Sequence, residues 1–520
     1  MRDGIRLFSL AYFPAGKGPW PALFQQYHSP LIQGDGTRLA SARLAAKGYV
    51  VFNVNFRGSQ VSEGTWSGYR ALGWGEHRDG YDTCEWLAVQ SWCDGKVGTF
   101  GPSQAGIAQN FLAVTQPPHL RAQYMIDTGL SLFHEAYRVG GTTRPQRFRL
   151  NDRYLTPTHP EQNVRLIAEW FEHPLYDDYW AAEDCTRHFG AMNIPCCTIG
   201  SWYDYMCTGS IQSFIGRQHQ GGPRSRGQQR LIIGPWSHAG APKSNKVGQL
   251  EYPPDARFDL YDHVQRWFDH HLKGISNGIE KEAAVRYYVM GAVGEAGAPG
   301  NVWRQADDWP VKALRSPYYL NADGILSGTR PTAATTTNYL SDPLHPATLP
   351  GVVFAGAQDA RPFESQPNVL TFTTAPLSTP VEWTGLVTAE LFVSSTARDT
   401  DFIVRVSDVY PDGRSMLLID AVRRARYRDG FDREVFMREG DVYPISFDVG
   451  WLSIVFNAGH RIRVTVSSNA APFYEVNPNT GDPLTPDPTD RMLVARNSLH
   501  HGGEHASRIV APVAVSLPDL

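Results

Sequence analysis

The first 300 residues alternate short apolar runs with segments of helical periodicity. Residues 49–55 form an almost continuous apolar run, which is typical of a strand buried on both faces of a parallel sheet. Further strands are predicted at 21–27, 96–101, 194–200 and 230–234, and apolar residues recur at helical spacing in 80–90 and 106–114. Strands and helices in alternation predict βαβ units, and therefore an α/β fold built on a mostly parallel sheet.

Residues 130–190 interrupt this alternation. The segment is rich in aromatic side chains, including Trp170, Tyr176 and Trp180, and its pattern indicates helices and loops. Because it stands between two groups of predicted strands, we expect a helical cap inserted into the α/β core. The core itself is expected to comprise 1–129 and 191–300.

After residue 300 the pattern becomes that of strands alone. Residues 369–373, 386–393, 402–406 and 461–466 alternate apolar and polar positions, and turn sequences such as Pro411-Asp412-Gly413-Arg414 separate them. Short alternating strands with turn signals predict a two-sheet β-sandwich over 301–520. Within it, the Pro-, Gly- and Thr-rich stretch 323–365 is expected to be linker and long loop.

Length and charge narrow the class of protein. A chain of 520 residues is expected to form two to four domains, and 42% hydrophobic with 19% charged residues is an ordinary globular composition. The formal net charge of −4 argues against a nucleic acid or an anionic membrane as the main partner. With no apolar run near the roughly 20 residues that span a bilayer, and no apolar signal segment at the N-terminus, a cytoplasmic location is expected.

The cysteines and histidines do not predict a metal centre. All six cysteines lie in the first 210 residues, and no two of them form a Cys-x-x-Cys pair. We therefore interpret them as core residues rather than as disulfide partners or zinc ligands. The run from His500 to His505 resembles a metal cluster, but we interpret it as a solvated loop because no strand or helix pattern adjoins it. No metal or other cofactor is expected.

A candidate nucleophile lies in Gly101-Pro102-Ser103-Gln104-Ala105-Gly106, between a predicted strand and a predicted helix. Glycines around a serine allow the sharp turn that exposes its hydroxyl above a sheet, at the N-terminus of the next helix. The spacing is Gly-x-Ser-x-x-Gly, which departs from the more common Gly-x-Ser-x-Gly. Such triplets also occur in ordinary loops, so the motif alone leaves both interpretations open.

Two further residues complete a possible catalytic triad. A serine nucleophile needs a base and an orienting carboxylate, which in α/β-hydrolases follow in the order Ser, acid, His. Asp204 follows the predicted strand 194–200, and His238 follows the strand 230–234. Strand carboxyl ends share one edge of a parallel sheet, so these residues and Ser103 are expected to converge. Individually, Asp204 could be a helix cap and His238 one of 17 unremarkable histidines.

These motifs resemble the cocaine esterase/X-prolyl dipeptidyl-peptidase (CocE/NonD) family of hydrolases, and the resemblance spans nearly the whole chain. The matching segments are Arg57-Gly58-Ser59-x-x-Ser62-Glu63-Gly64, Glu76-x-x-Asp79-Gly80-Tyr81-Asp82-Thr83-x-Glu85-Trp86-Leu87, Gly101-x-Ser103, Trp202-Tyr203-Asp204, Gly234-Pro235-Trp236-Ser237-His238, Asp399-Thr400-Asp401-Phe402, Asp408-Val409-x-Pro411-Asp412-Gly413 and Gly459-His460-Arg461-Ile462-Arg463. The resemblance implies an α/β-hydrolase core, a helical cap and a C-terminal jelly roll.

The resemblance also implies an oxyanion hole, formed by the backbone N–H of Gln104 and the hydroxyl of Tyr27. A tyrosine at a strand end can equally be a core residue. His28, Trp202 and Trp236, beside these motifs, are the expected substrate contacts. Two positions depart from the family: Gln104 stands where tyrosine is frequent, and His28 where aspartate is.

Substrates with a free α-amino group are disfavoured by a third departure. Family members that bind such a group use several carboxylates, but the corresponding stretch 131–138 has only Glu135. We therefore predict a serine hydrolase that cleaves a small acyl ester, or an aryl amide, through an acyl-enzyme. The alternatives are an X-prolyl dipeptidyl aminopeptidase or α-amino-acid ester hydrolase and, from another class, a catalytically silent ligand-binding scaffold. The β domain offers surface for a homo-oligomer.

Overall fold

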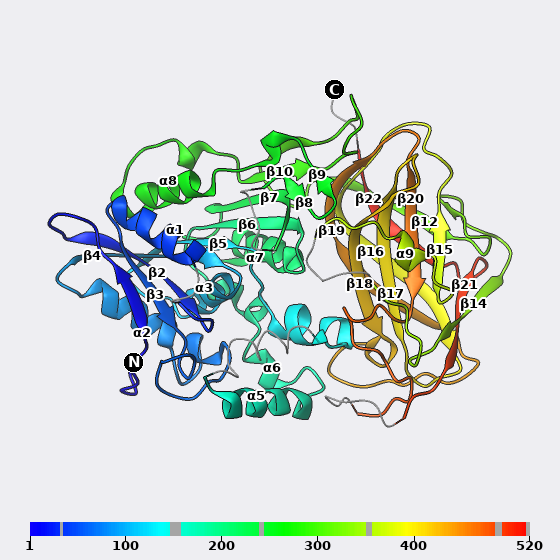
Figure 1. Ribbon diagram of the computed structural model, residues 1–520, viewed down its shortest axis with the longest axis horizontal. Coiled ribbons are helices and arrows are strands. Elements are labelled where there is room, and N and C mark those ends of the chain that lie inside the picture. The colour runs from blue at the N-terminus through cyan, green and yellow to red at the C-terminus, as the bar shows by residue number, and fades with distance from the viewer. Residues whose placement is uncertain (32–34, 146–157, 239–243, 350–355, 484–490, 516–520) are drawn as a thin grey trace.

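The chain folds into an α/β part and a β-rich part that lie side by side (Figure 1). The computed structural model describes residues 1–31, 35–145, 158–238, 244–349, 356–483 and 491–515. Figure 1 shows the α/β part in blue to green, the β-rich part in yellow-green to red, and the helices α5 and α6 at the bottom of the α/β part.

The α/β part is organised around one nine-stranded sheet within the described residues. Its spatial order is β1 (Ser9–Tyr12), β3 (Val50–Asn55), β2 (Trp20–Tyr27), β4 (Cys93–Pro102), β5 (Leu120–Ile126), β6 (Cys196–Tyr203), β7 (Gln229–Ser237), β10 (Val285–Val289) and β11 (Val302–Ala306). The strands from β3 to β10 pair in parallel, and the edge strands β1 and β11 are antiparallel. Every residue of β3 is buried, as its continuous apolar run predicts.

Helices cover both faces of this sheet. They are α1 (Asp35–Ala46), α2 (Asp79–Ala88), α3 (Gln104–Val114), α7 (Cys207–Gln220) and α8 (Leu260–Lys273). Residues of α1 and α8, such as Leu44 and Phe268, share a core with Tyr124 on one face. Residues of α2 and α3, such as Leu87 and Phe111, form a second core on the other face. The carboxyl ends of the parallel strands therefore form one edge between two helical layers.

Between β5 and β6 the chain forms short helices. They are a π-helical turn η2 (Phe133–Tyr137), the 3₁₀ turns η3 (Val139–Gly141) and η4 (Cys185–Ala191), and the helices α5 (Pro160–Glu172) and α6 (Asp178–Ala181). Trp170 and Trp180 are buried in the same core as Leu87 and Phe111, so this segment packs onto the α/β part. Other short elements are η1 (Arg70–Leu72), η5 (Pro254–Ala256), η6 (Ile279–Lys281) and the hairpin β8 (Lys246–Val247) and β9 (Leu250–Glu251).

The β-rich part contains a seven-stranded and a four-stranded antiparallel sheet among the described residues. The larger consists of β12 (Ala313–Leu320), β13 (Leu326–Ser327), β14 (Thr335–Ser341), β16 (Val381–Ser395), β19 (Tyr443–Phe456), β21 (Ala495–His501) and β22 (Arg508–Ala514). The smaller consists of β15 (Val369–Thr373), β17 (Asp401–Val409), β18 (Ser415–Arg424) and β20 (Arg461–Ser467), and α9 (Arg361–Glu364) and η7 (Ala425–Tyr427) lie in connections.

The two parts share one hydrophobic core. Trp202 and Phe214 of the α/β part belong to the same cluster of buried residues as Trp383 and Trp451 of the β-rich part. Backbone hydrogen bonds join Met290, directly after β10, to β19: Met290 N–H donates to Ser453 O at 2.9 Å, and Val455 N–H donates to Met290 O at 2.8 Å. The β-rich part therefore packs against the α/β part as a continuous structure.

Most of the strands and helices expected from the pattern are confirmed, with informative exceptions. The predicted linker 323–365 contains β14, which pairs with β21 throughout its length. His500 and His501 end β21, and His501 is buried with Nδ1 at 2.6 Å from Leu320 O, so the expected solvated loop there is wrong. The expected core border at 300 falls between β10 and β11, which pair with each other.

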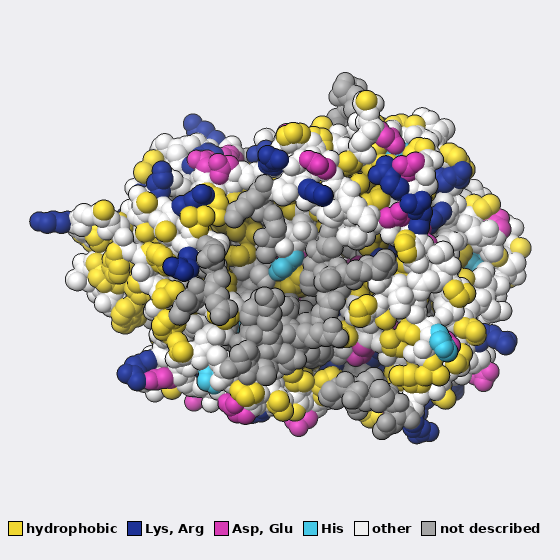
Figure 2. All heavy atoms as spheres, in the orientation of Figure 1, with side chains coloured by type: hydrophobic (Ala, Val, Ile, Leu, Met, Phe, Trp, Pro, Cys, Tyr) yellow, Lys and Arg dark blue, Asp and Glu magenta, His cyan; other side chains and the backbone are white. Residues whose placement is uncertain are grey.

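All six cysteines are buried and free. Among the helices of the described residues, none combines the length and the apolar character needed to cross a bilayer. On the face shown in Figure 2, acidic and basic side chains of the described residues are interspersed over both parts.

Candidate active site

Ser103 lies at a sharp turn between β4 and α3. Its backbone adopts a φ of 54° and a ψ of −111°, which is strained for a residue with a side chain. Two residues earlier, Gly101 has a φ of +129°, and a Cβ at that position would lie 2.6 Å from the Cβ of Ala105. Glycine is therefore required there for the strand to turn directly into the helix.

A chain of hydrogen bonds links Ser103, His238 and Asp204. Ser103 Oγ lies 3.0 Å from Nε2 of His238, and Nδ1 of His238 lies 2.9 Å from Oδ1 of Asp204. The three residues follow or end β4, β7 and β6, so the edge formed by the strand carboxyl ends brings them together. The Asp204 side chain is fully buried, whereas that of His238 is 16% exposed. This arrangement can transfer a proton from the serine to the histidine.

Asp127 lies beside this chain. The ligand atoms of Asp127, Asp204 and His238 lie within 4.8 Å of one another, which is the spacing of a possible metal site. However, Asp127 Oδ1 accepts a hydrogen bond from Ser201 Oγ at 2.8 Å, and Asp204 Oδ1 also accepts from the Met206 N–H at 3.1 Å. Since both ring nitrogens of His238 face Ser103 or Asp204, the donor set suits acid–base chemistry better than metal ligation.

Gln104 and Tyr27, the two residues expected to form the oxyanion hole, have different surroundings. Gln104 begins α3, where its backbone N–H has no acceptor within the helix. Its side chain accepts from the His28 N–H at 3.0 Å and the Ser29 N–H at 3.3 Å, and so ties the loop after β2 to the turn at Ser103. The Tyr27 hydroxyl donates to Gln25 Oε1 at 2.6 Å and lies against Gly101.

The three expected substrate contacts are all buried. The ring of His28 packs edge-on against Phe56 and Trp66. Trp202 lines the cavity described next, and its Nε1 donates to Tyr288 O at 2.8 Å. Trp236 is 1% exposed within the core between the sheet and α8, and its Nε1 donates to Ala256 O at 2.9 Å. In the structure, Trp236 therefore packs within the hydrophobic core.

A cavity of about 610 Å³ lies next to Asp204, between the two parts of the molecule. Its walls include Trp202, Asp204 and Tyr205 after β6, Glu135 of η2, and residues of β17, β18 and β19. A second cavity, of about 670 Å³, lies along α1 and α8 and is lined by Tyr27 and Gly101. The first cavity is therefore the one that the β-rich part helps to form.

Two residues in the first cavity were missed as site residues. Tyr205 directly follows Asp204, and its hydroxyl lies 3.4 Å from Nε2 of His238. Its position next to the acid was the available signal in the sequence. Glu135 is partly buried and accepts from the Leu130 N–H at 3.0 Å. Burial, supported by the charges of Asp184 and Asp204, raises the pKa of Glu135 to about 8, so its carboxyl group is protonated near neutral pH.

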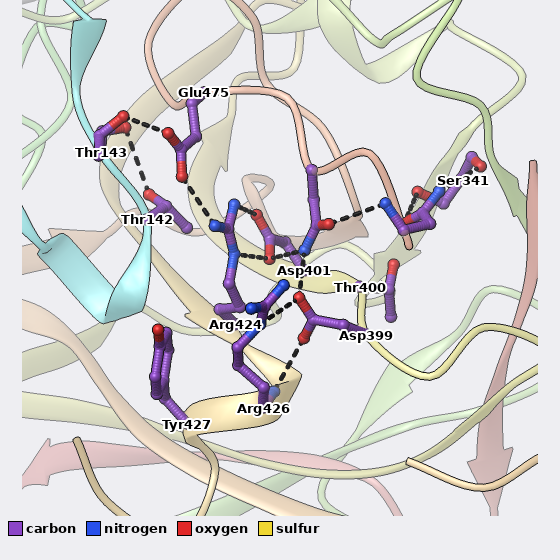
Figure 3. A network of polar contacts seen from close by, with 12 residues as sticks. Thr142, Thr143, Ser341, Asp399, Thr400, Asp401, Arg424, Arg426, Tyr427 and Glu475 are labelled. Atoms are coloured by element: carbon purple, nitrogen blue, oxygen red, sulfur yellow. Dashed lines mark hydrogen bonds and ion pairs between the residues drawn. The ribbon is translucent and has the colours of Figure 1, made fainter. Parts of the chain in front are cut away.

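Figure 3 shows a polar network that joins the segment after η3, next to the cavity residue Arg144, to the β-rich part. Arg424 Nε binds Asp401 at 2.8 Å and its Nη1 binds Glu475 at 2.8 Å, while Arg426 binds Asp399 at 2.8 Å. Glu475 in turn accepts from the Thr143 hydroxyl, and the Glu475 N–H donates to Thr143 O at 3.0 Å. The segment after η3 is therefore anchored to the β-rich part.

Comparison with known proteins yields matches over both parts of the chain. Residues 3–165 and 151–240 match the X-Pro dipeptidyl-peptidase (S15 family) profile, and residues 277–510 match the X-Pro dipeptidyl-peptidase C-terminal non-catalytic domain. A cocaine esterase from Rhodococcus sp. (strain MB1 Bresler) is 30% identical over 577 residues, covering 99% of this chain and 97% of that protein.

Solved structures share the whole fold. An aminopeptidase from a marine sediment Thaumarchaeota archaeon and an α-amino acid ester hydrolase each superpose with a TM-score of 0.85 at 22% identity, covering 99% of this chain and 95% of theirs. A CocE/NonD family hydrolase from Staphylococcus aureus superposes with a TM-score of 0.78 at 19% identity, covering 99% of this chain and 92% of that one. At these identities the structural matches speak for the fold alone.

Proposed function

Because the chain belongs to the family of serine hydrolases that includes cocaine esterase and the X-Pro dipeptidyl-peptidases, we propose that it hydrolyses acyl esters through an acyl-enzyme formed on Ser103. The observation that carries this proposal is the hydrogen-bonded chain from Ser103 through His238 to Asp204, at the strained turn before α3. A serine hydroxyl becomes a nucleophile when such a base and carboxylate are aligned with it.

The proposed reaction proceeds in two halves. His238 Nε2 accepts the proton of Ser103 as Oγ attacks the ester carbonyl, and then delivers that proton to the leaving alcohol. Asp204 keeps Nδ1 protonated and stabilises the imidazolium that forms. In the second half the same nitrogen activates a water molecule, which releases the acid and restores Ser103.

The oxyanion of each tetrahedral intermediate would be held by two donors. The Gln104 N–H follows the nucleophile directly and lies at the positive end of α3. The Tyr27 hydroxyl is the second donor that we propose. It lies against Gly101 but donates to Gln25, so it would exchange this partner for the oxyanion during the reaction.

The stretch 131–138, in the wall of the first cavity, supports an ester substrate over one with a free amino group. Glu135, the sole acidic residue of 131–138, has its pKa raised by burial to about 8, so it is a poor partner for an ammonium group at neutral pH. The related cocaine esterase points in the same direction. We further propose that the helical segment 130–190 acts as a cap over the site and that the β-rich part is a jelly roll that completes the pocket.

Hydrolysis of p-nitrophenyl esters from acetate to octanoate tests the proposal, together with fluorophosphonate labelling. The wild type is expected to turn over these esters and to be labelled, and Ser103→Ala is expected to lose both while remaining folded. Ser131→Ala, a change in the cavity beside Asp204, serves as the matched control. A Ser103→Ala protein with wild-type activity would refute the assignment of the nucleophile, and an unlabelled, inactive wild type would favour a silent scaffold.

A further inference from the structure

The cavity beside Asp204 contains two buried arginines that form no ion pair with the described residues. Arg144 follows η3 and Arg405 lies in β17, and their exposed fractions are 6% and 5%. In both side chains, Nε and Nη1 are buried and have no hydrogen-bond partner among the described residues. Ion pairs to either guanidinium are also absent from the part of the chain that the structure describes.

Aromatic rings hold both guanidinium groups in place. The guanidinium carbon of Arg144 lies 4.8 Å from the ring centre of Phe473 and 5.6 Å from that of Tyr205. That of Arg405 lies 4.6 Å from the ring centre of Phe363. A ring face attracts the cation but does not satisfy the N–H groups at its edge. Both groups are thus oriented and supported, while the hydrogen-bonding capacity of Nε and Nη1 remains unused.

Two other buried arginines of the β-rich part have carboxylate partners. Arg424 and Arg426 are also buried, and each is bound by carboxylates in the network of Figure 3. A buried guanidinium without a carboxylate is unfavourable for folding alone. An anion that enters the cavity would supply the missing partner.

The charges around the cavity leave room for such an anion. Five carboxyl groups line it: Glu135, Asp204, Asp359, Asp420 and Asp448. Glu135 is protonated near neutral pH, Asp204 binds His238, and Asp359 binds Arg361 at 2.6 Å. Asp448 interacts electrostatically with Arg423, which is a third arginine in the cavity lining. Asp420, which accepts from the Tyr474 hydroxyl at 3.3 Å, lies opposite Arg405 in the pairing of β17 with β18, and its charge acts on that guanidinium.

We propose that Arg144 and Arg405 bind a carboxylate carried by the substrate, so that this enzyme prefers esters with an acid group to their neutral counterparts. The proposal rests on the function proposed for Ser103. Tyr205 connects the arginines to the proposed catalytic residues. The guanidinium carbon of Arg144 lies 5.6 Å from the centre of the Tyr205 ring, and the centre of the His238 ring lies 4.6 Å from it. One aromatic ring therefore separates the carboxylate site from the reacting atoms.

Matched pairs of esters test this preference. One pair carries the acid in the acyl group, namely p-nitrophenyl monoadipate and its methyl ester. The other carries it in the leaving group, namely 4-acetoxybenzoate and its methyl ester. A charge-assisted hydrogen-bonded pair predicts that kcat/KM is about 10- to 100-fold higher for the charged member of one pair. Which pair shows the preference identifies the side of the ester bond that faces the arginines.

Variants separate binding from structure. Arg144→Met and Arg405→Met are expected to remove the preference and leave turnover of the neutral esters within about threefold. Their melting temperatures should stay level or rise, because an unpaired buried charge is removed. Arg405→Lys is expected to retain part of the preference, and Arg6→Gln, an exposed arginine, serves as the control for a lost charge. A structural role would instead lower the melting temperature and affect both esters of a pair equally.

Each outcome has a separate meaning. Turnover of neutral esters without any preference for an acid overturns this proposal and leaves the function of Ser103 intact. If no ester is turned over and Ser103 is not labelled, the proposed function fails, and calorimetric titration with monomethyl adipate against dimethyl adipate decides the carboxylate site by itself. Binding of the monoester that Arg144→Met and Arg405→Met each weaken about tenfold or more upholds the site, and equal binding of the two compounds rejects it.

Discussion

The hydroxyl of Tyr205 lies 3.4 Å from Nε2 of His238, the nitrogen that faces Ser103. The two rings are also close, with centres 4.6 Å apart. Tyr205 is therefore placed to orient the imidazole and to contact a leaving group at the point where the proton is delivered. Directly after Asp204, Tyr205 brings the proposed acid, the proposed base and the cavity wall into contact.

We expect Tyr205→Phe to lower kcat for neutral esters about tenfold, because it removes a hydroxyl at the proton-transfer nitrogen but keeps the ring. Steady-state kinetics on p-nitrophenyl butyrate measure this effect. The matched control is Tyr203→Phe, whose hydroxyl bonds to that of Tyr252 at 2.7 Å away from His238. An equal loss in both variants would indicate a structural effect of the cavity wall.

Asp204→Asn is expected to lower kcat by about 10³- to 10⁴-fold. The amide keeps the size of the side chain but cannot hold His238 in the tautomer that accepts the serine proton. Labelling of Ser103 by a fluorophosphonate should slow in parallel, while the melting temperature changes little. Asp127→Asn is the comparison, since Asp127 bonds to Ser201; if it proved as damaging as Asp204→Asn, the orienting role would belong to both acids.

The sequence predicts which residues form the hydrogen-bonded chain at this site better than it predicts which residues line the cavity beside it. Ser103, Asp204 and His238 each follow a recognisable strand, and the parallel sheet brings strand ends together, so local pattern and topology suffice. Trp236 illustrates the limit: it lies two residues before His238 in the sequence, but the side chain packs in the core beside α8. Whether a side chain at a strand end points toward the cavity or into the core depends on the strand register. The local sequence pattern does not reveal that register.

The carboxylate site could not be predicted at all. Arg144 and Arg405 come from distant parts of the chain and meet only because the β-rich part packs against the α/β part. The strand β14 was hidden for a related reason: its Thr-rich sequence resembles a loop, and its pairing with β21 involves residues far away in the sequence. Non-local pairing therefore accounts for much of what was missed.

Glu135→Gln is expected to stabilise the protein at alkaline pH. Burial raises the pKa of Glu135 from 4.5 to about 8, so the folded state keeps a proton that the unfolded state releases. The stability linked to this proton is complete below pH 4.5 and is lost as the pH rises to about 8. The neutral amide avoids this loss, which is on the order of a few kcal/mol.

Urea denaturation at pH 5 and pH 9 measures the effect of Glu135→Gln. The difference in unfolding free energy between variant and wild type should be more favourable to the variant at pH 9 than at pH 5. Glu161→Gln, which alters an exposed carboxylate, is expected to show no such change. A pH-independent difference for Glu135→Gln would mean that the wild-type carboxyl group ionises normally.

His460 is predicted to make the junction between the two parts sensitive to pH. It is completely buried, with Nδ1 at 2.8 Å from Asp408 of β17 and Nε2 at 2.9 Å from Glu295 of the β10–β11 connection. Burial lowers its pKa, but hydrogen bonds and charges of Asp408 and Glu295 outweigh this and raise the pKa above 6.5; Arg414 also lies near these acids. Only the doubly protonated ring can donate to both carboxylates.

The sign of the effect follows from the raised pKa. The stability that His460 contributes is complete below pH 6.5 and is lost as the pH rises through its folded-state pKa. The wild-type melting temperature should therefore fall between pH 6 and pH 9, and His460→Gln should flatten this fall while lowering the melting temperature most at pH 6. His345→Gln removes an exposed histidine that pairs with Asp342 at 3.0 Å, and it should leave the profile unchanged. An unaltered slope in His460→Gln would show that His460 does not carry the charge linking the two parts.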